Sequence, residues 1–158
     1  LGYIYWKRGD YSIASRYYHE GGAKPGAPVW LEAMSARLVA EGGSRDLARE
    51  MYRNMAAQSN DEKVKLMANL RLLQIDSFDE RDVIRPALAQ YRERNGGKCP
   101  AVWAQVAKEL HAARVLGKFP LRFDNAGAPV DPSGVPYVLM QDTCTPVIDW
   151  NNSKVPYQ

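Results

Sequence analysis

The residues best suited to chemistry are three aspartates near the C-terminus, Asp131, Asp142 and Asp149. Carboxylate oxygens are the ligands that Mg²⁺ and Ca²⁺ prefer, so these three side chains could surround a metal ion. The chain has no HisGluXxxXxxHis pair, no phosphate-binding loop and no GlyXxxGlyXxxXxxGly pattern. An enzyme with a metal in this segment is therefore the least favoured hypothesis, and we predict no catalytic residue, no cofactor and no metal site.

Two cysteines and two histidines are the other reactive side chains. Cys99 and Cys144 lie far in sequence from His19 and His111, and two cysteines cannot form a metal site alone. Each cysteine precedes or nearly precedes a proline, which places both on loops. They are either two free thiols or one disulfide, and a disulfide would imply an oxidising compartment.

The overall composition is that of a globular domain, with 46% hydrophobic and 25% charged residues among 158. The net charge is +3, and opposite charges are interspersed along the chain. A nucleic-acid reader would gather Lys and Arg on one face, so we expect no nucleic-acid binding. No stretch approaches the ~20 apolar residues of a membrane span. The chain lacks an initiator Met and opens on what reads as the middle of a helix, so we expect a piece of a longer protein, with a membrane anchor possible upstream.

The elements that must position any site begin with a helical hairpin over residues 1–28. Gly9 can adopt the left-handed conformation that ends a helix, and Asp10 can cap the next one. Ala14 is small enough for two helices to approach closely, and Tyr18 lies one turn further along the same face. These residues predict an antiparallel pair of helices.

The same pattern returns over residues 29–60, where Trp30 lies in the first helix, GluGlyGlySer (41–44) forms the turn and Ser44 is expected to cap the next helix. Ala48 and Tyr52 then repeat the small residue and the aromatic 34 residues later. A period of 34 residues is the length of a tetratricopeptide repeat.

The chain therefore resembles the tetratricopeptide repeat family. The resemblance is carried by Leu1, Gly2, Tyr5, Gly9, Asp10, Tyr11, Ala14, Tyr18, Trp30, Ala48 and Tyr52. The family usually has Ala where this chain has Gly21. The resemblance implies an all-α fold, an α-solenoid of stacked helical hairpins, and binding of a protein or peptide partner.

Two capping boxes predict further helices. SerAsnAspGlu (59–62) opens one helix, and SerPheAspGlu (77–80) opens another, where we interpret the acidic residues as favourable charge at a helix N-terminus. AsnGlyGly (95–97) ends the second, so residues 61–97 are interpreted as a degenerate third repeat. A last helix begins with Pro100 and covers residues 100–116, and we expect Gly117 to end it.

From residue 118 the chain is dense in turn-forming residues. We therefore expect a repeat domain over residues 1–117 and a non-helical tail rich in Pro, Gly and Asp over residues 118–158. Segments 135–140 and 146–150 could pair as a short β-hairpin in this tail.

The stretch from residue 88 to residue 139 is similar to the closing element of many bacterial repeat proteins of the cell envelope, and type II secretion pseudopilins have a similar layout. The matching residues are Tyr91, Asn95, Gly96, Pro100, Asp131, Pro132, Gly134, Pro136 and Tyr137. The resemblance implies an extracytoplasmic location, periplasmic or extracellular, and a cytoplasmic location is the alternative.

Aromatic residues crowd the first hairpin, and the repeat pattern does not require Tyr3, Trp6 or Tyr17. These three either cover a missing upstream helix or form an interaction surface, a role that Tyr and Trp often serve. The favoured hypothesis is a non-enzymatic interaction scaffold in a bacterial envelope or extracellular assembly. The alternative is a structural subunit that assembles with copies of itself into a fibre or tube, through open solenoid ends and the tail.

Overall fold

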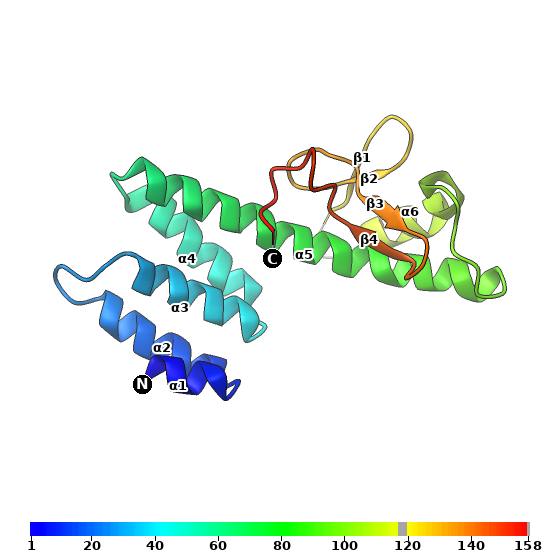
Figure 1. Cartoon of the computed structure of the whole chain (residues 1–158). Coiled ribbons are helices and arrows are strands. Elements are labelled where there is room, and N and C mark those ends of the chain that lie inside the picture. The colour runs from blue at the N-terminus through cyan, green and yellow to red at the C-terminus, as the bar shows by residue number, and fades with distance from the viewer. Residues whose placement is uncertain (117–119, 158) are drawn as a thin grey trace. The chain divides into compact units, whose positions relative to one another are not determined.

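The computed structural model describes residues 1–116 and 120–157 (Figure 1). Its helices are α1 (Gly2–Lys7), α2 (Tyr11–Gly22), α3 (Trp30–Glu41), α4 (Arg45–Gln58), α5 (Glu62–Arg94) and α6 (Ala107–Leu116), with a short 3₁₀ helix η1 (Trp103–Val106) before α6. Two antiparallel strand pairs follow: β1 (Arg122–Phe123) with β2 (Pro129–Val130), and β3 (Val138–Met140) with β4 (Thr145–Val147). The predicted mainly helical fold with a short β-hairpin near the C-terminus is confirmed at this level.

The chain divides into two compact units, residues 1–75 and residues 76–158. The boundary between the two units falls inside α5, whereas the sequence predicted the boundary between a helical domain and a non-helical tail after residue 117. The segment expected as a tail belongs to the second unit together with the second half of α5 and with α6.

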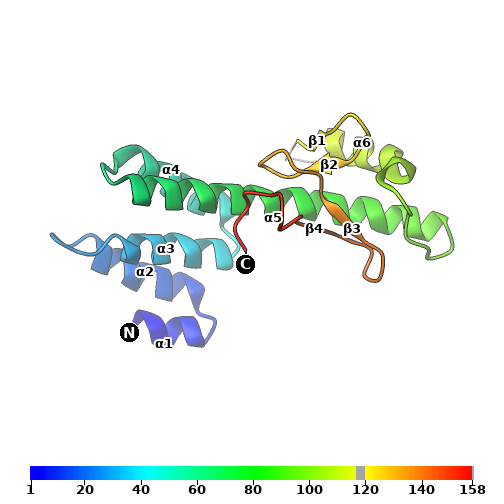
Figure 2. The same ribbon diagram turned by 45° about the horizontal axis from the view of Figure 1, so that its top comes forward.

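In the first unit, α1, α2 and α3 lie side by side in both views, and α4 packs against α3 (Figures 1 and 2). The two turns of this stack repeat each other. Gly9 and Gly43 both have positive φ, at 80° and 90°. In each turn the next amide donates a 3.0 Å hydrogen bond to the carbonyl five residues earlier: Asp10 to Tyr5, and Ser44 to Val39. The second turn therefore reproduces the first at an offset of 34 residues.

Asp10 and Ser44 precede α2 and α4 at the N-cap position, as expected, but neither side chain makes a cap hydrogen bond. The expectation of side-chain capping there was wrong. Backbone hydrogen bonds across the turn close both structures instead, and both side chains stay exposed.

Small residues allow the close packing of these helices. Ala14 on α2 and Ala48 on α4 are both fully buried. A methyl group on Gly2 would lie 2.9 Å from the Tyr18 ring, so only glycine lets α1 approach α2 this closely. The apolar core of the unit joins α3, α4 and the first half of α5 through Ala36, Ala48, Tyr52, Ala68 and Ile75.

Helix α5 is one continuous helix of 33 residues, with Pro86 inside it. The predicted helix start at SerPheAspGlu (77–80) is therefore wrong, and residues 61–97 do not form a hairpin. Ser77 is fully buried inside the helix, where its hydroxyl lies within hydrogen-bond distance, 3.1 Å, of the Tyr137 hydroxyl. A capping box is only a local preference, and burial of this face against the rest of the second unit outweighs it.

The second unit packs one face of α5 against α6 and the strand pairs (Figure 1). Ser77, Glu80, Ile84 and Leu88 are buried at spacings of three and four residues, so they form a single stripe on the helix. The remaining core side chains include Val106, Leu110, Leu121, Tyr137 and Ile148. Polar residues thus occupy one end of a core-facing stripe, and apolar residues occupy the other.

Two details of the second unit differ from the prediction. The strand pair β1–β2 was not predicted; its turn is closed by the Asp124 carboxylate, which accepts from the amides of Ala126 and Ala128 at 2.9 and 2.8 Å. The helix expected from Pro100 begins instead with η1 at Trp103, and the Pro100 carbonyl accepts a 3.0 Å hydrogen bond from Gln141. Its expected stop at Gly117 lies outside the described residues.

Predicted segments 135–140 and 146–150 do form the expected hairpin. Val138 pairs with Val147 and Met140 with Thr145. Within the described residues, no helix has both the length and the apolar character needed to cross a bilayer.

Candidate functional site

The first unit contains a groove of about 430 Å³ between α3, α4 and α5, here called the α3–α5 groove. Its apolar lining is Val29, Trp30, Ala33, Met34, Val64 and Met67. Trp30 is 59% exposed, which is a large apolar surface to leave in water. An apolar hollow with a few polar groups at its edge is the usual form of a binding site.

Residues that line this groove lie at matching separations in the sequence. Trp30 and Val64 lie 34 residues apart, as do Arg37 and Arg71. Helix α3 and the first half of α5 therefore each contribute an apolar residue and an arginine to the groove, seven residues apart on each helix.

The polar side chains of the groove are Arg37, Lys63, Arg71 and Tyr52, and its lining contains no carboxylate. The Tyr52 hydroxyl donates a 3.2 Å hydrogen bond to the carbonyl of Ala33. Burial raises the pKa of Tyr52, against the opposing charges of Arg71 and Arg37. The positive charges of two guanidinium groups, one on α3 and one on α5, thus favour the ionised form of one buried hydroxyl.

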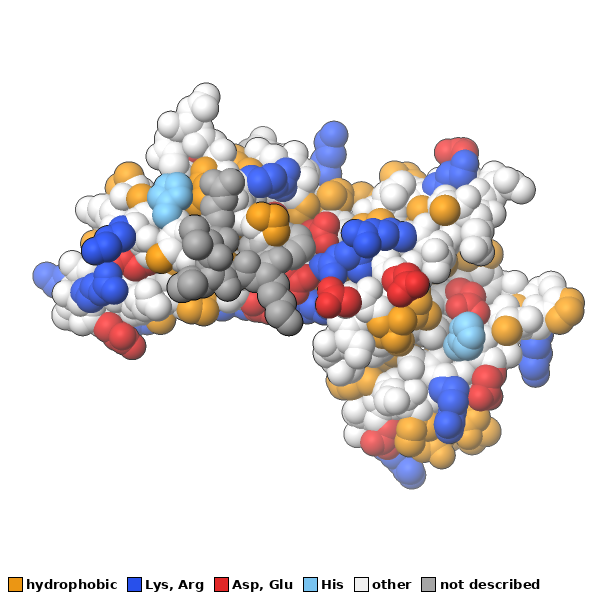
Figure 3. Space-filling view, turned by 180° about the vertical axis from the view of Figure 1, so that it is seen from behind, with side chains coloured by type: hydrophobic (Ala, Val, Ile, Leu, Met, Phe, Trp, Pro, Cys, Tyr) orange, Lys and Arg blue, Asp and Glu red, His pale blue; other side chains and the backbone are white. Residues whose placement is uncertain are grey.

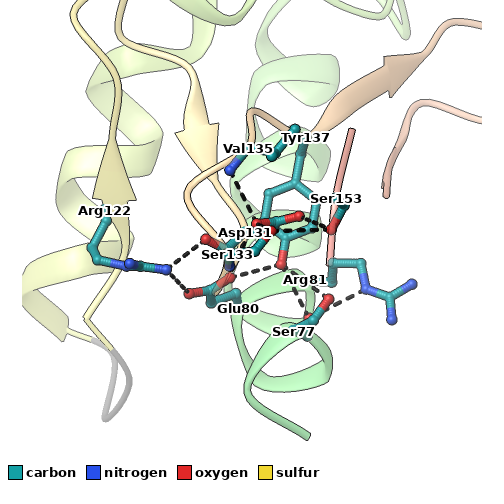
Figure 4. Close-up of polar contacts among 9 residues, drawn as sticks. All are labelled: Ser77, Glu80, Arg81, Arg122, Asp131, Ser133, Val135, Tyr137 and Ser153. Carbon is teal, nitrogen blue, oxygen red and sulfur yellow. Dashed lines mark hydrogen bonds and ion pairs between the residues drawn. The ribbon is translucent and has the colours of Figure 1, made fainter. Parts of the chain in front are cut away.

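The second unit contains a buried polar cluster, here called the Glu80 cluster (Figure 4). The Tyr137 hydroxyl lies 2.7 Å from Glu80 Oε2 and 3.1 Å from Ser77 Oγ. Arg122 Nη2 lies 3.6 Å from Glu80 Oε1 and also donates to the carbonyl of Asp131. Glu80 and Tyr137 are each only 2% exposed.

Asp131 holds the adjoining turn together in Figure 4. One carboxylate oxygen accepts from the amide of Ser133 at 2.8 Å, from the Ser133 hydroxyl at 2.7 Å and from the amide of Val135 at 3.1 Å. The other oxygen accepts from the Ser153 hydroxyl. The Asp-Pro-x-Gly-x-Pro-Tyr segment is therefore organised around a buried aspartate, which is 1% exposed.

The electrostatics of the cluster follow from this burial. Desolvation raises the pKa of Glu80 to about 7, although the hydrogen bond from Tyr137 and the charge of Arg122 oppose the rise. Burial, and then the nearby Glu80 charge, raise the pKa of Tyr137. A carboxyl group that titrates near neutral pH could exchange protons with a substrate.

The cluster is nevertheless closed on itself. Among the described residues, no buried side-chain nitrogen or oxygen lacks a hydrogen-bond partner. The carboxylates of Glu80 and Asp131 accept hydrogen bonds from side chains and backbone amides of the same unit. We interpret the Glu80 cluster as a structural hydrogen-bond network that attaches the strand segments to α5.

The predicted interaction residues lie on the first hairpin and do not line the groove. Tyr3 contacts Trp6 with ring centroids 5.8 Å apart, and Tyr17 stacks on Tyr5 at 5.4 Å. Trp6 donates a 3.3 Å hydrogen bond to Glu41 on α3. Their role in binding stays a prediction.

Of the repeat signature residues, Trp30 and Tyr52 do line the groove, whereas Gly9, Ala14 and Ala48 shape the turns and helix crossings. Tyr18 packs edge-on against Trp30, with ring centroids 6.2 Å apart.

The three aspartates considered as metal ligands lie in different surroundings and share no common site among the described residues. Asp131 belongs to the Glu80 cluster, Asp142 is exposed, and Asp149 accepts from the amide of Asn151 and the side chain of Asn152. In the part of the chain that the structure describes, no group of three His, Cys, Asp or Glu side chains is arranged to hold a metal ion. The histidines also have other contacts: His19 lies 3.2 Å from Glu32, and His111 lies against the Phe123 ring.

Cys99 and Cys144 form a disulfide, with their Cα atoms 5.5 Å apart. Of the two alternatives left open by the sequence, the structure has the bonded one. The bond joins the loop after α5 to the turn of the β3–β4 hairpin.

Sequence reasoning missed the polar groups that matter most in both units. Glu80 was interpreted as favourable charge at a helix N-terminus, although its spacing from Ile84 and Leu88 places it on the buried stripe. Arg37 and Arg71 were not singled out, although the 34-residue offset between them was visible in the sequence.

Charged side chains on the face drawn in Figure 3 alternate in sign, and no large patch of Lys and Arg stands out there. No family model, no curated protein and no solved structure matches the chain. The class of protein must therefore be argued from the fold and the groove.

Proposed function

We propose that this chain is a non-enzymatic interaction scaffold of the tetratricopeptide type, in which the α3–α5 groove binds a segment of a partner protein. The observation that carries the proposal is the repetition of the groove lining, in which Trp30 and Arg37 on α3 recur as Val64 and Arg71 on α5. Alternate helices, here α3 and α5, that present equivalent residues to one surface are what a stacked repeat of helical hairpins produces.

The α-solenoid arrangement belongs to this proposal. Its support is the reproduction of the Gly9 turn at Gly43 and the burial of Ala14 and Ala48 at equivalent positions. The first half of α5 then takes the place of the first helix of a third repeat. Its second half enters the second unit, where a second helix of that repeat would have turned back.

An extracytoplasmic location, periplasmic or extracellular, is also proposed. The disulfide between Cys99 and Cys144 supports it, because such bonds persist in oxidising compartments and are rare in the cytosol.

Selection from a library of displayed random peptides tests the scaffold function. The purified chain, its Trp30→Ala variant and its Trp150→Ala variant are each used as bait. Trp30 lines the groove, whereas Trp150 is similarly exposed but lies in the second unit. We expect peptides that bind the parent and the Trp150→Ala variant but not the Trp30→Ala variant. Peptides that bind the Trp30→Ala variant as well as they bind the parent would contradict binding in the α3–α5 groove.

Self-assembly into a fibre or tube is the second candidate function. The observation that favours it is the exposed apolar surface of the first helix, where Leu1, Tyr3 and Ile4 are 76%, 55% and 50% exposed. An apolar patch of this kind is typical of a contact surface. Sedimentation of the parent and of an Ile4→Lys variant tests it: concentration-dependent polymers that the substitution abolishes are expected, and a monomer at high concentration would rule it out.

A further inference from the structure

We propose that the segment bound in the α3–α5 groove is acidic: a peptide that seats an apolar side chain beside Trp30 and Met67 and pairs flanking Asp or Glu residues with Lys63 and Arg71. This inference rests on the proposed scaffold function and adds the chemistry of the partner.

The placement of the cations is the first argument. Arg37 on α3 and Arg71 on α5 lie 34 residues apart, and both line the groove together with Tyr52. Lys63, also in the lining, lies two turns before Arg71 on the same helix. Both helices therefore contribute positive charge to the groove, and α5 contributes it at two positions.

The charge balance is the second argument. Arg37 is partly neutralised by Glu41, whose carboxylate lies 2.7 Å from its Nε. Lys63 and Arg71 have no carboxylate partner among the described residues, and Arg71 donates only to the amide oxygen of Gln74. The half-buried guanidinium of Arg71 thus keeps donors available for a carboxylate, which pairs with guanidinium in a two-pronged geometry.

The apolar lining of the groove favours a peptide over a nucleic acid as the ligand. Val29, Met34, Val64 and Met67 offer aliphatic and thioether surface, which suits aliphatic side chains, and Met-rich surfaces adapt to varied partners. Nucleic-acid sites combine their positive charge with aromatic platforms for successive bases, and here Trp30 is the single exposed aromatic in the lining.

The test begins with the composition of the peptides that the display selection returns. Groove-dependent peptides enriched in Asp and Glu are expected. Three labelled probes with one apolar centre, flanked by Glu, Gln or Lys, then measure the preference by fluorescence anisotropy. We expect the Glu probe to bind at least tenfold more tightly than the Gln probe and to weaken as salt increases.

Variants of the protein locate the effect. The double substitution Lys63→Glu, Arg71→Glu should weaken binding of the Glu probe at least tenfold. If this charge reversal disturbs folding, the milder double substitution Lys63→Gln, Arg71→Gln should still weaken binding of the Glu probe. Arg53→Glu is the control, because Arg53 is exposed on α4 outside the groove.

The outcomes separate the two proposals. Groove-dependent peptides that are neutral or basic would overturn the acidic preference and leave the scaffold function intact. A selection that yields no groove-dependent peptide would overturn both. Displacement of the Glu probe by single-stranded oligothymidine at equal concentration would show that the site takes nucleic acid, and would overturn the assignment to a peptide.

Discussion

The hydroxyl of Tyr137 donates a 2.7 Å hydrogen bond to the carboxylate of Glu80, 57 residues earlier in the chain. Tyr137 immediately precedes β3, and Glu80 lies on the buried stripe of α5, so this bond joins the strand segments to the helix. Both side chains are withdrawn from water, which makes the stability of the second unit depend on pH and on the integrity of the bond.

Replacement of Glu80 by Gln should flatten the pH dependence of stability. The folded-state pKa of Glu80 is about 7, above the value of roughly 4.3 for an unperturbed carboxyl group. The folded chain therefore holds this proton more tightly than the unfolded chain, and the stabilisation, complete below pH ~4.3, is lost as pH rises through about 7. A shift of this size corresponds to about 3–4 kcal/mol. Urea unfolding of the parent and of Glu80→Gln at pH 5 and pH 8 measures it, and equal pH slopes would show that Glu80 is not the group responsible.

Replacement of Tyr137 by Phe should destabilise the chain by about 1–3 kcal/mol, because Glu80 loses a buried donor and the Ser77 hydroxyl loses its buried hydrogen-bond partner. The loss should be greater at pH 8 than at pH 5, since the ionised carboxylate needs the hydroxyl more than the neutral acid does. The matched control is Tyr3→Phe, whose ring is 55% exposed and whose hydroxyl takes part in no such cluster. Similar losses for both variants would mean that the Tyr137 hydroxyl has no special role.

Removal of the disulfide by a Cys99→Ser, Cys144→Ser double substitution should lower the free energy of unfolding by about 4 kcal/mol on the chain-entropy model. The estimate uses the separation of 45 residues between the two cysteines. Thermal unfolding of the parent with and without dithiothreitol provides a second route to the same quantity. The double variant should be insensitive to the reductant, and a parent that is equally insensitive would contradict a stabilising bond.

Two glycine substitutions should act in opposite directions. Gly43 has a φ of 90° and open space around the position of a Cβ, so Gly43→Ala should cost about 1–2 kcal/mol from backbone strain alone. Gly21 lies inside α2, where an added Cβ would meet Leu31 at an ordinary 3.5 Å. Gly21→Ala should therefore stabilise the chain by about 0.5–1 kcal/mol. Chemical denaturation of both variants decides this, and a neutral Gly43→Ala would argue against the left-handed turn.

Much of the first unit could be predicted from sequence because its signals are local. A glycine that ends a helix, a small residue at a helix crossing and a 34-residue period each depend on residues close together in the chain. The turns at Gly9 and Gly43 form where expected, and Ala14 and Ala48 are buried in helices. Side-chain capping by Asp10 and Ser44 failed as a prediction because backbone hydrogen bonds already close the turns.

The sequence by itself determined the helical character of most of residues 1–116, the 34-residue offset between the turns at Gly9 and Gly43, and the β-hairpin between β3 and β4. Only the tertiary structure decided that α5 continues past Ser77, that Glu80 and Asp131 are buried, that Cys99 bonds to Cys144, and that Arg37 and Arg71 line one groove. The physical reason is distance along the chain. Propensity, capping and turn conformation are set by neighbouring residues, whereas the burial of a charge and the pairing of two thiols depend on segments that meet only after the chain has folded.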